Sequence, residues 1–355
     1  MKSISKYISS AVMFVAAALA FTSCDDWTEP KHIDLDYGTI DNADPAAYEK
    51  YLANLREYRG LPHKHVYAWF NNVETAFGSQ GHRVSALPDS IDVIVINNPE
   101  KVTNQMIQEM YEVRVNKGQQ FSYCVSFDVI KADYTALCEE LAAKRIAYIN
   151  EHGEDAQIPE ELLDPDFIEY LAESTSYKLT FFNTVGFDCI MAAFDGKSTL
   201  HMTPVELAEY KTQANAFLGL IVDWLSRNSE VKLDLLGKPQ NVGTDVLSKV
   251  RYSFFSQSAG ATNKDQYTLF MLEAGNALPE AQYGMVAYIP DASGADAKLG
   301  YYTNGGLAVN GLAEWTAANP VGAVGIMNAS DNYFMTSGQY NDIRNLIQTV
   351  NPSAK

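Results

Sequence analysis

Short apolar segments with the composition of β-strands alternate with segments of helical periodicity along most of this sequence. Eight strands are predicted, over residues 65–70, 91–96, 121–127, 187–193, 231–236, 250–255, 267–272 and 321–327. Continuous apolar strands are typical of parallel sheets that are covered on both faces. The sequence therefore predicts an α/β protein, a (β/α)8 TIM barrel. A doubly wound open sheet has the same pattern and is the alternative.

The connections between these strands hold helices and one long loop. Helices are predicted over residues 48–58, 104–116, 132–149, 164–179, 203–226 and 340–350. Residues 292–311 are rich in Gly, Ala and Asn, which indicates an extended loop after a strand. We find no internal repeat and no sign of a second domain.

The N-terminal segment has the features of a signal peptide. Lys2 and Lys6 precede an apolar stretch over residues 8–21, which is too short to span a membrane comfortably. Small residues stand directly before Cys24, which is similar to a bacterial lipoprotein signal, although Phe21 stands where Leu is usual. We expect residues 1–23 to be removed and Cys24 to be acylated, so that the chain meets the membrane through a lipid anchor only. An ordinary secretory signal that ends near a cysteine is the alternative.

An acidic segment follows the expected acylation site. Residues 24–46 contain proline and acidic residues without apolar periodicity, which indicates a tether, and residues 47–355 would form the barrel. Asp25 and Asp26 directly follow the cysteine. Acidic residues there resemble the surface-export signal of lipoproteins in outer-membrane glycan-uptake systems. We therefore expect an outer-membrane lipoprotein at the cell surface, with components of such a system as partners.

Charge and missing motifs exclude several functions. The chain has 44 acidic and 26 basic residues and a net charge of −18, and such a surface repels nucleic-acid phosphates. Dinucleotide, P-loop, serine-elbow and zinc-protease motifs are all missing, so no cofactor and no metal are expected. Besides Cys24 the chain has Cys124, Cys138 and Cys189, an odd number without short spacing, which argues against a disulfide framework.

Several short motifs occur in an order that resembles a known family. They are Tyr51-Leu52-x-Asn54-Leu55-Arg56-x-Tyr58, Trp69-Phe70, Leu87-Pro88-Asp89-Ser90-Ile91-Asp92, and Tyr340-Asn341-Asp342-Ile343-Arg344 with Asn351-Pro352. Together they resemble glycoside hydrolase family 18, most closely its endo-β-N-acetylglucosaminidase branch, over about residues 48–352. The resemblance implies a barrel that interacts with N-acetylglucosamine-containing glycans such as N-glycans.

The family's catalytic signature, D-G-x-D-x-D-x-E at the end of the fourth strand, corresponds here to residues 185–192. Gly186 and Asp188 match the signature, and Val185 replaces its first Asp. Ile190 replaces the Asp that orients the substrate's N-acetyl group, and Ala192 replaces the Glu that protonates the leaving oxygen. General-acid catalysis contributes about 10²–10⁴-fold, so the resemblance implies a barrel with little or no activity.

A second family motif is altered as well. The Q-x-Y motif of the sixth strand retains Gln257, but Ala259 stands in place of the Tyr that helps to hold the reaction intermediate. Asp128, Asp195 and Glu273 could supply a relocated acid, although rim carboxylates without a catalytic role are the expectation. We therefore expect no catalytic residue in this chain.

The predicted ligand site lies where strands end, because barrel sites lie at the carboxyl ends of their strands. Amide, carboxylate and aromatic side chains there can pair with sugar hydroxyls and stack on a pyranose face. The candidate glycan-binding residues are Trp69, Asn71, Asn97, Asp128, Asp188, Asp195, Gln257, Glu273, Asn328 and Asp331. Packing is the alternative for Trp69 and the expectation for Phe70, and Asp188 is expected to point into the barrel.

The sequence therefore predicts a surface-anchored, non-catalytic protein that captures N-acetylglucosamine-containing oligosaccharides. An active glycosidase with a relocated acid is the first alternative. A lipoprotein that binds other proteins and no sugar is the second.

Overall fold

The computed structural model describes residues 44–73, 77–258 and 260–352. The predicted signal peptide, Cys24, most of the tether and Ala259 lie outside the described residues. The chain divides into two compact units, residues 1–51 and 52–355. In the first unit the described residues form the start of helix α3 (Pro45–Tyr58), where the Asp44 carboxylate accepts a hydrogen bond from the Ala47 N–H at 3.0 Å. Among the described residues, the second unit holds the rest of α3 and the other elements.

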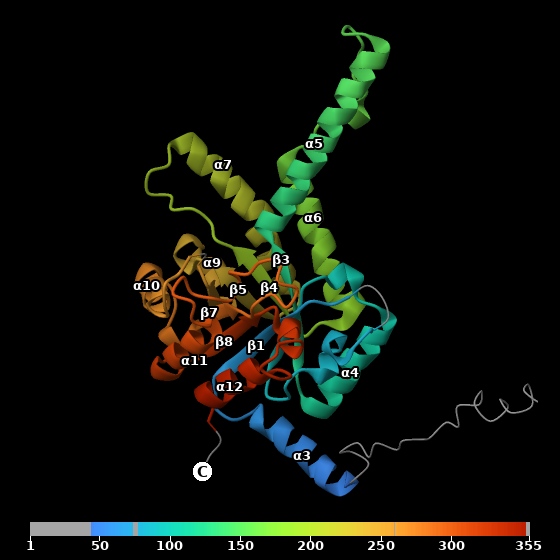
Figure 1. Cartoon of the computed structure of the whole chain (residues 1–355). Coiled ribbons are helices and arrows are strands. Elements are labelled where there is room, and N and C mark those ends of the chain that lie inside the picture. The colour runs from blue at the N-terminus through green and yellow to red at the C-terminus, as the bar shows by residue number, and fades with distance from the viewer. Residues whose placement is uncertain (1–43, 74–76, 259, 353–355) are drawn as a thin grey trace, which may run out of the picture. The chain divides into compact units, whose positions relative to one another are not determined.

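Eight parallel strands close into a barrel in chain order (Figure 1). They are β1 (His65–Phe70), β2 (Val93–Ile96), β3 (Gln120–Ser126), β4 (Cys189–Phe194), β5 (Lys232–Gly237), β6 (Val250–Ser256), β7 (Tyr283–Tyr288) and β8 (Ala323–Met327). The last strand pairs with the first, with Val324 opposite Val66 and Ile326 opposite Ala68. This pairing closes the sheet, so the TIM barrel is confirmed and the open-sheet alternative is wrong.

The helices connect successive strands. They are α4 (Asn104–Lys117), α5 (Phe127–His152), α6 (Phe167–Phe181), α7 (Pro204–Ala214), α8 (Leu220–Arg227), α9 (Thr244–Leu247), α10 (Asp265–Ala274), α11 (Ala308–Ala318) and α12 (Asn341–Val350). Helix α5 starts directly after β3 and extends well past the strand ends, with α6 running back beside it (Figure 1). A π-helical turn, Asn215–Gly219, joins α7 to α8. Helices α5 and α6 therefore extend beyond the strand ends on one side of the barrel (Figure 1).

The prediction of a strand over residues 267–272 is wrong, because this segment belongs to helix α10. Tyr267 and Ala274, seven residues apart, are buried on one side of the helix. Leu269 and Leu272 are instead 64% and 74% exposed. A short run of apolar residues fits a strand or a helix equally well, so its composition could not separate the two. The seventh strand of the barrel is β7, which lies further along the chain.

Side chains alternate strictly between the inside and the outside of the barrel. One apolar cluster fills the interior and includes Tyr67, Trp69 and Phe254. A second, larger cluster lies between the outer face of the strands and the helices, and it includes Val66 and Phe70. The period of two along each strand therefore decides which residues can face a ligand in the barrel.

A buried ion pair lies within the barrel. The Asp234 carboxylate on β5 is completely buried and accepts hydrogen bonds from Arg251 Nη2 at 2.7 Å and Nε at 3.0 Å. The Tyr67 hydroxyl donates to the same carboxylate at 3.0 Å, and Arg251 also donates to Gln120 Oε1 at 3.2 Å. Burial lowers the pKa of Arg251, but the Asp234 charge outweighs burial, so the net pKa is raised. The group links β1, β3, β5 and β6 across the interior.

We expect the Asp234→Ala variant to lose about 3–5 kcal/mol of unfolding free energy, because it leaves the Arg251 charge buried without a partner. Urea denaturation followed by circular dichroism measures this loss. The control is Glu140→Ala, which removes an exposed ion pair with Lys144 on α5. That change should cost less than about 1 kcal/mol. Equal losses in the two variants would contradict the assigned role of the buried pair.

Candidate functional site

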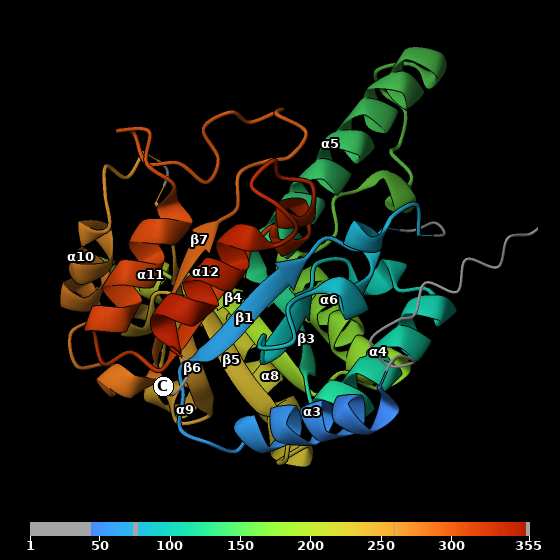
Figure 2. The same cartoon turned by 60° about the horizontal axis from the view of Figure 1, so that its bottom comes forward.

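The carboxyl ends of the strands form the mouth of the barrel. Two long loops, residues 289–307 after β7 and residues 328–340 after β8, rise over this end in Figure 2. The first of them confirms most of the extended loop predicted over residues 292–311, although residues 308–311 belong to helix α11. Ligands of such barrels bind among these loops and the residues that follow the strands.

Three predicted amide residues meet at one side of the mouth. The Asn97 side-chain amide donates to Asn71 Oδ1, and the Asn71 amide donates to Asn328 Oδ1 at 3.5 Å. These residues follow β2, β1 and β8, and Asn97 is exposed. Asn328 has a left-handed backbone with φ of 55°, a conformation that Asn tolerates better than most residues. The structure therefore builds an amide cluster that presents donors and acceptors to the mouth.

Gln257 lies at the mouth but is used to position a loop. Its amide donates to the Tyr301 carbonyl at 3.4 Å, and its oxygen accepts from the Tyr288 N–H at 3.4 Å. These bonds hold the loop after β7 against the ends of β6 and β7. The Tyr301 ring is 37% exposed and lines a pocket of about 720 Å³ together with Tyr302 and Lys298.

A second exposed aromatic ring lies in the loop after β8, the strand that pairs with β7. Phe334, in the loop after β8, is 48% exposed, and its ring lies 5.9 Å from the ring of His82 in the loop after β1. Asp331, three residues before it, is half-buried, and burial raises the pKa of its carboxyl. The sequence analysis missed Tyr301 and Phe334. Tyr301 could have been predicted, because it is an aromatic residue within the predicted Gly-rich loop. The sequence around Phe334 has no comparable signal.

The three candidate acids gather in one sector of the mouth. Burial raises the pKa of Asp195, and the Asp128 carboxylate raises it further. Lys238 opposes this effect, and Glu273 adds to it more weakly. Lys238 and Glu273 form an ion pair at 2.7 Å. Glu273 does not follow a strand as predicted, since it lies near the end of α10.

Trp69 cannot stack on a sugar, so its prediction as a glycan-binding residue is wrong. Its side chain is only 2% exposed and packs inside the barrel against Tyr67 and Phe254, with ring centroids 6.4 and 5.9 Å away. A side chain on Gly325 would come within 2.7 Å of the Trp69 ring, so this glycine makes room for it. Phe70 is buried on the outer face, as expected.

Asp188 does not point into the barrel, and its prediction as a glycan-binding residue is also wrong. It directly precedes β4, at the end of the barrel opposite to the mouth. Its carboxylate accepts hydrogen bonds from Arg114 Nε at 2.9 and 3.0 Å and from the Phe121 N–H at 2.8 Å. It therefore ties α4 and β3 to the start of β4.

The register of β4 also corrects the alignment with the catalytic signature. Ile190 and Ala192 belong to the outer core beneath the helices, so neither can face a substrate. The inner face of this strand carries Cys189, Met191 and then Ala193, which pairs with Ser126 of β3. A shift of one residue turns every side chain of a strand to the other face. The inward residues of β4 thus carry no carboxylate, and Asp195 is the next residue in that series.

Within residues 44–73, 77–258 and 260–352, no group of three or more His, Cys, Asp or Glu side chains could hold a metal ion. No helix in the described part of the chain is long and apolar enough to cross a membrane.

The chain is similar to known proteins in its sequence pattern and in its fold. A model of glycoside hydrolase family 18, BT1044-like, matches residues 28–349. A selenomethionine form of a BT1044 variant has a TM-score of 0.56 at 14% identity, covering 88% of this chain and 95% of its own. An endo-β-N-acetylglucosaminidase from Cordyceps militaris has a TM-score of 0.57 at 12% identity, covering 85% and 96%.

A variant of the Cordyceps enzyme in complex with fucosyl-N-acetylglucosamine-Asn has a TM-score of 0.52 at 13% identity, covering 85% of this chain and 95% of its own. At these identities the likenesses show a shared fold. No curated protein sequence matches the chain.

We expect Asp128→Asn to lower the pKa of Asp195, because it removes a negative charge that disfavours the Asp195 carboxylate. Lys238→Met should raise the same pKa, since it removes the opposing positive charge. Carboxyl ¹³C NMR across a pH titration measures both shifts. Asp331→Asn, in another sector of the mouth, is the control and should leave the Asp195 pKa unchanged. Shifts of one sign in both variants would contradict the arrangement.

Proposed function

Because this chain belongs to glycoside hydrolase family 18, in its BT1044-like group, we propose that its barrel mouth binds an N-acetylglucosamine-containing oligosaccharide of the N-glycan type without cleaving it. The observation that carries this proposal is the inner face of β4, where Met191 and Ala193 stand in place of carboxylates. The relative solved with fucosyl-N-acetylglucosamine-Asn supports the choice of ligand.

The mouth offers the groups that sugar binding needs. The amides of Asn71, Asn97 and Asn328 can donate to and accept from sugar hydroxyls and an N-acetyl group. The exposed rings of Tyr301 and Phe334 can cover the apolar C–H face of a pyranose. Few polar groups between aromatic walls are typical of ligand pockets.

The same mouth lacks the machinery for substrate-assisted cleavage. The family's D-x-D-x-E pattern places three carboxylates at every second residue, so all three lie on one face of the strand. On the inner face of β4 the two positions before Asp195 are Met191 and Ala193, and neither can hold an acetamide by a hydrogen bond. Without that bond the N-acetyl oxygen is not oriented toward the anomeric carbon.

A second candidate function is a working glycosidase with Asp195 as the relocated acid. If the Glu of the pattern is placed on Asp195, its two Asp positions fall on the inward residues Met191 and Ala193. Burial and Asp128 raise the pKa of this carboxyl, and a raised pKa is what a general acid requires to keep its proton near neutral pH. The two candidate functions can therefore be separated by measuring hydrolysis of a glycan.

The cellular role follows from the expected anchor. We propose that acylation at Cys24 holds the barrel at the outer surface of the outer membrane. The bound oligosaccharide would then pass to a neighbouring hydrolase or transporter of a glycan-uptake system. A lipoprotein that binds only other proteins is the competing role.

We expect Tyr301→Ala and Phe334→Ala each to weaken glycan binding about tenfold, because each removes one stacking surface. Isothermal titration calorimetry with an N,N′-diacetylchitobiose-asparagine glycan measures the affinities. Tyr177→Ala is the control, since this tyrosine is exposed on α6. A glycan array without hits, together with a co-purifying protein partner, would favour the protein-binding role instead.

We expect the wild-type protein to release no glycan from a high-mannose glycopeptide, as followed by mass spectrometry over a long incubation. Release that Asp195→Asn abolishes and Asp331→Asn leaves intact would establish the glycosidase in its place.

A further inference from the structure

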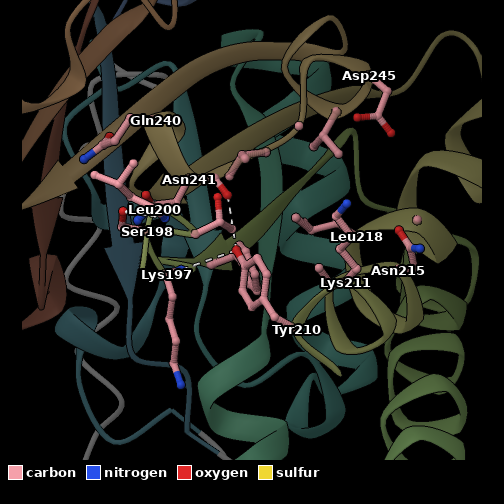
Figure 3. Close-up of a pocket in the computed structure, with 17 residues that line it drawn as sticks. Lys197, Ser198, Leu200, Tyr210, Lys211, Asn215, Leu218, Gln240, Asn241 and Asp245 are labelled. Carbon is pink, nitrogen blue, oxygen red and sulfur yellow. Dashed lines mark hydrogen bonds between the residues drawn. The ribbon is translucent and has the colours of Figure 1, made fainter. Parts of the chain in front are cut away.

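We propose a second carbohydrate site, on the outer flank of the barrel, that takes a sugar bearing a carboxylate or sulfate group. It is a pocket of about 490 Å³ between the loop after β4, the helix α7 with the π-helical turn that follows it, and the segment that leads from β5 into α9 (Figure 3). This volume lies within the range of small-ligand sites. The proposal rests on the proposed function only in taking the ligand to be a sugar.

Tyr210 holds the walls of this pocket together. Its hydroxyl accepts a hydrogen bond from the Lys197 N–H at 3.3 Å and donates to the Asn241 carbonyl at 3.2 Å. Gly196 has φ of +60°, and a side chain there would lie 2.8 Å from the Tyr210 hydroxyl. The loop after β4 can therefore approach the helix closely only because this residue is glycine. Three separate segments are fixed by one side chain, so the pocket is formed before any ligand binds.

The inner wall of the pocket is apolar. Phe194, the last residue of β4, faces outward and stacks on Tyr210 with ring centroids 6.5 Å apart. Leu218, Val242 and Val246 complete this wall. Because Phe194 points away from the barrel interior, the pocket lies behind β4 and is separate from the mouth. An apolar wall of this kind can cover the C–H face of a sugar ring.

Several polar side chains of the remaining lining have a group without a hydrogen-bond partner among the described residues. Gln240 Oε1 is buried without a hydrogen bond. In the part of the chain that the structure describes, no hydrogen bond or ion pair engages the side chains of Lys197, Lys211 or Asn215. Figure 3 shows side chains of the β4–α7 loop on one side of Tyr210, and those of the α7–α8 segment on the other. A buried acceptor without a donor carries a free-energy cost, which a ligand hydroxyl or amide would remove.

Asn215 lies at the start of the π-helical turn between α7 and α8. Such turns disturb the regular helix and occur often at functional sites. Here the turn Asn215–Gly219 supplies Asn215, Leu218 and Gly219 to the lining. The irregularity therefore coincides with the pocket.

The charge of the lining indicates the class of ligand. Lys197 and Lys211 are exposed lining residues, whereas Asp245 is the one carboxylate among the lining residues. The pocket thus has a net charge of +1 in a chain of net charge −18. Lysine binds carboxylate and sulfate oxygens as a point charge, and the two groups share this chemistry. An acidic sugar fits the two lysines, and the amides of Asn215 and Gln240 fit its hydroxyls.

The test is calorimetric titration of the intact mature protein with four probes. N-Acetylneuraminic acid and glucuronic acid carry a carboxylate, 6-sulfo-N-acetylglucosamine carries a sulfate, and N-acetylglucosamine is neutral. We expect Lys197→Met and Lys211→Met each to weaken binding of an acidic probe about tenfold. Lys131→Met, at an exposed position on α5, is the matched control and should leave binding unchanged.

Asp245→Asn should strengthen binding of the acidic probe, because it removes a negative charge that repels the ligand. Weaker binding in this variant, or binding of the neutral sugar that Lys197→Met and Lys211→Met weaken to the same extent, would overturn the assignment of an anionic ligand. Failure of all three acidic probes to bind would overturn the site itself. Comparison of the carboxylated and sulfated probes then identifies the preferred anion.

The two proposed sites can fail separately. Tyr301→Ala and Phe334→Ala should leave binding of the acidic probe unchanged, since both residues lie in the mouth. A protein that binds the acidic probe but no neutral glycan would contradict the proposed function and support this site. A protein that binds a neutral glycan but no acidic probe would support the proposed function and contradict this site.

Discussion

Closure of the barrel imposes the constraint on which the other features depend. Once β8 pairs with β1, every strand has one face in a confined interior and one face against the helices. The interior is filled by large side chains such as Trp69 and Phe254, and the Asp234–Arg251 pair occupies its polar part. No strand can shift by one residue without exchanging these two environments.

This constraint moves the chemistry to the residues that follow the strands. Trp69 is too deep to meet a ligand, whereas Asn71, two residues later on the same face, reaches the mouth. In β4 the inward series runs through Met191 and Ala193 to Asp195. The carboxylate therefore stands beyond the strand, where partial burial and then the neighbouring charges raise its pKa.

The end of β4 also separates the two proposed sites. Phe194 faces outward and forms the wall of the flank pocket, while Asp195 follows it on the side of the mouth. A glycan that is held in the mouth and an acidic sugar on the flank would thus contact adjacent residues of one loop. The loop after Asp195 is therefore the segment through which binding at one site could change the affinity of the other.

The sequence by itself determined the alternation of apolar strands with helices, which is compatible with few folds, and its ordered motifs indicated the family. The pairing of β8 with β1 then decided between a closed barrel and an open sheet. The sequence also placed Asn71, Asn97 and Asn328 at the mouth, since residues after parallel strands share one edge. Only the tertiary structure decided that residues 267–272 are helical and that Ile190 and Ala192 face the helices. A short apolar run has the same composition whether it forms a helix or a strand. Which side chains of a strand point into the barrel depends on the strands with which it pairs. The contacts between distant loops, such as Gln257 with Tyr301, have no local signal at all.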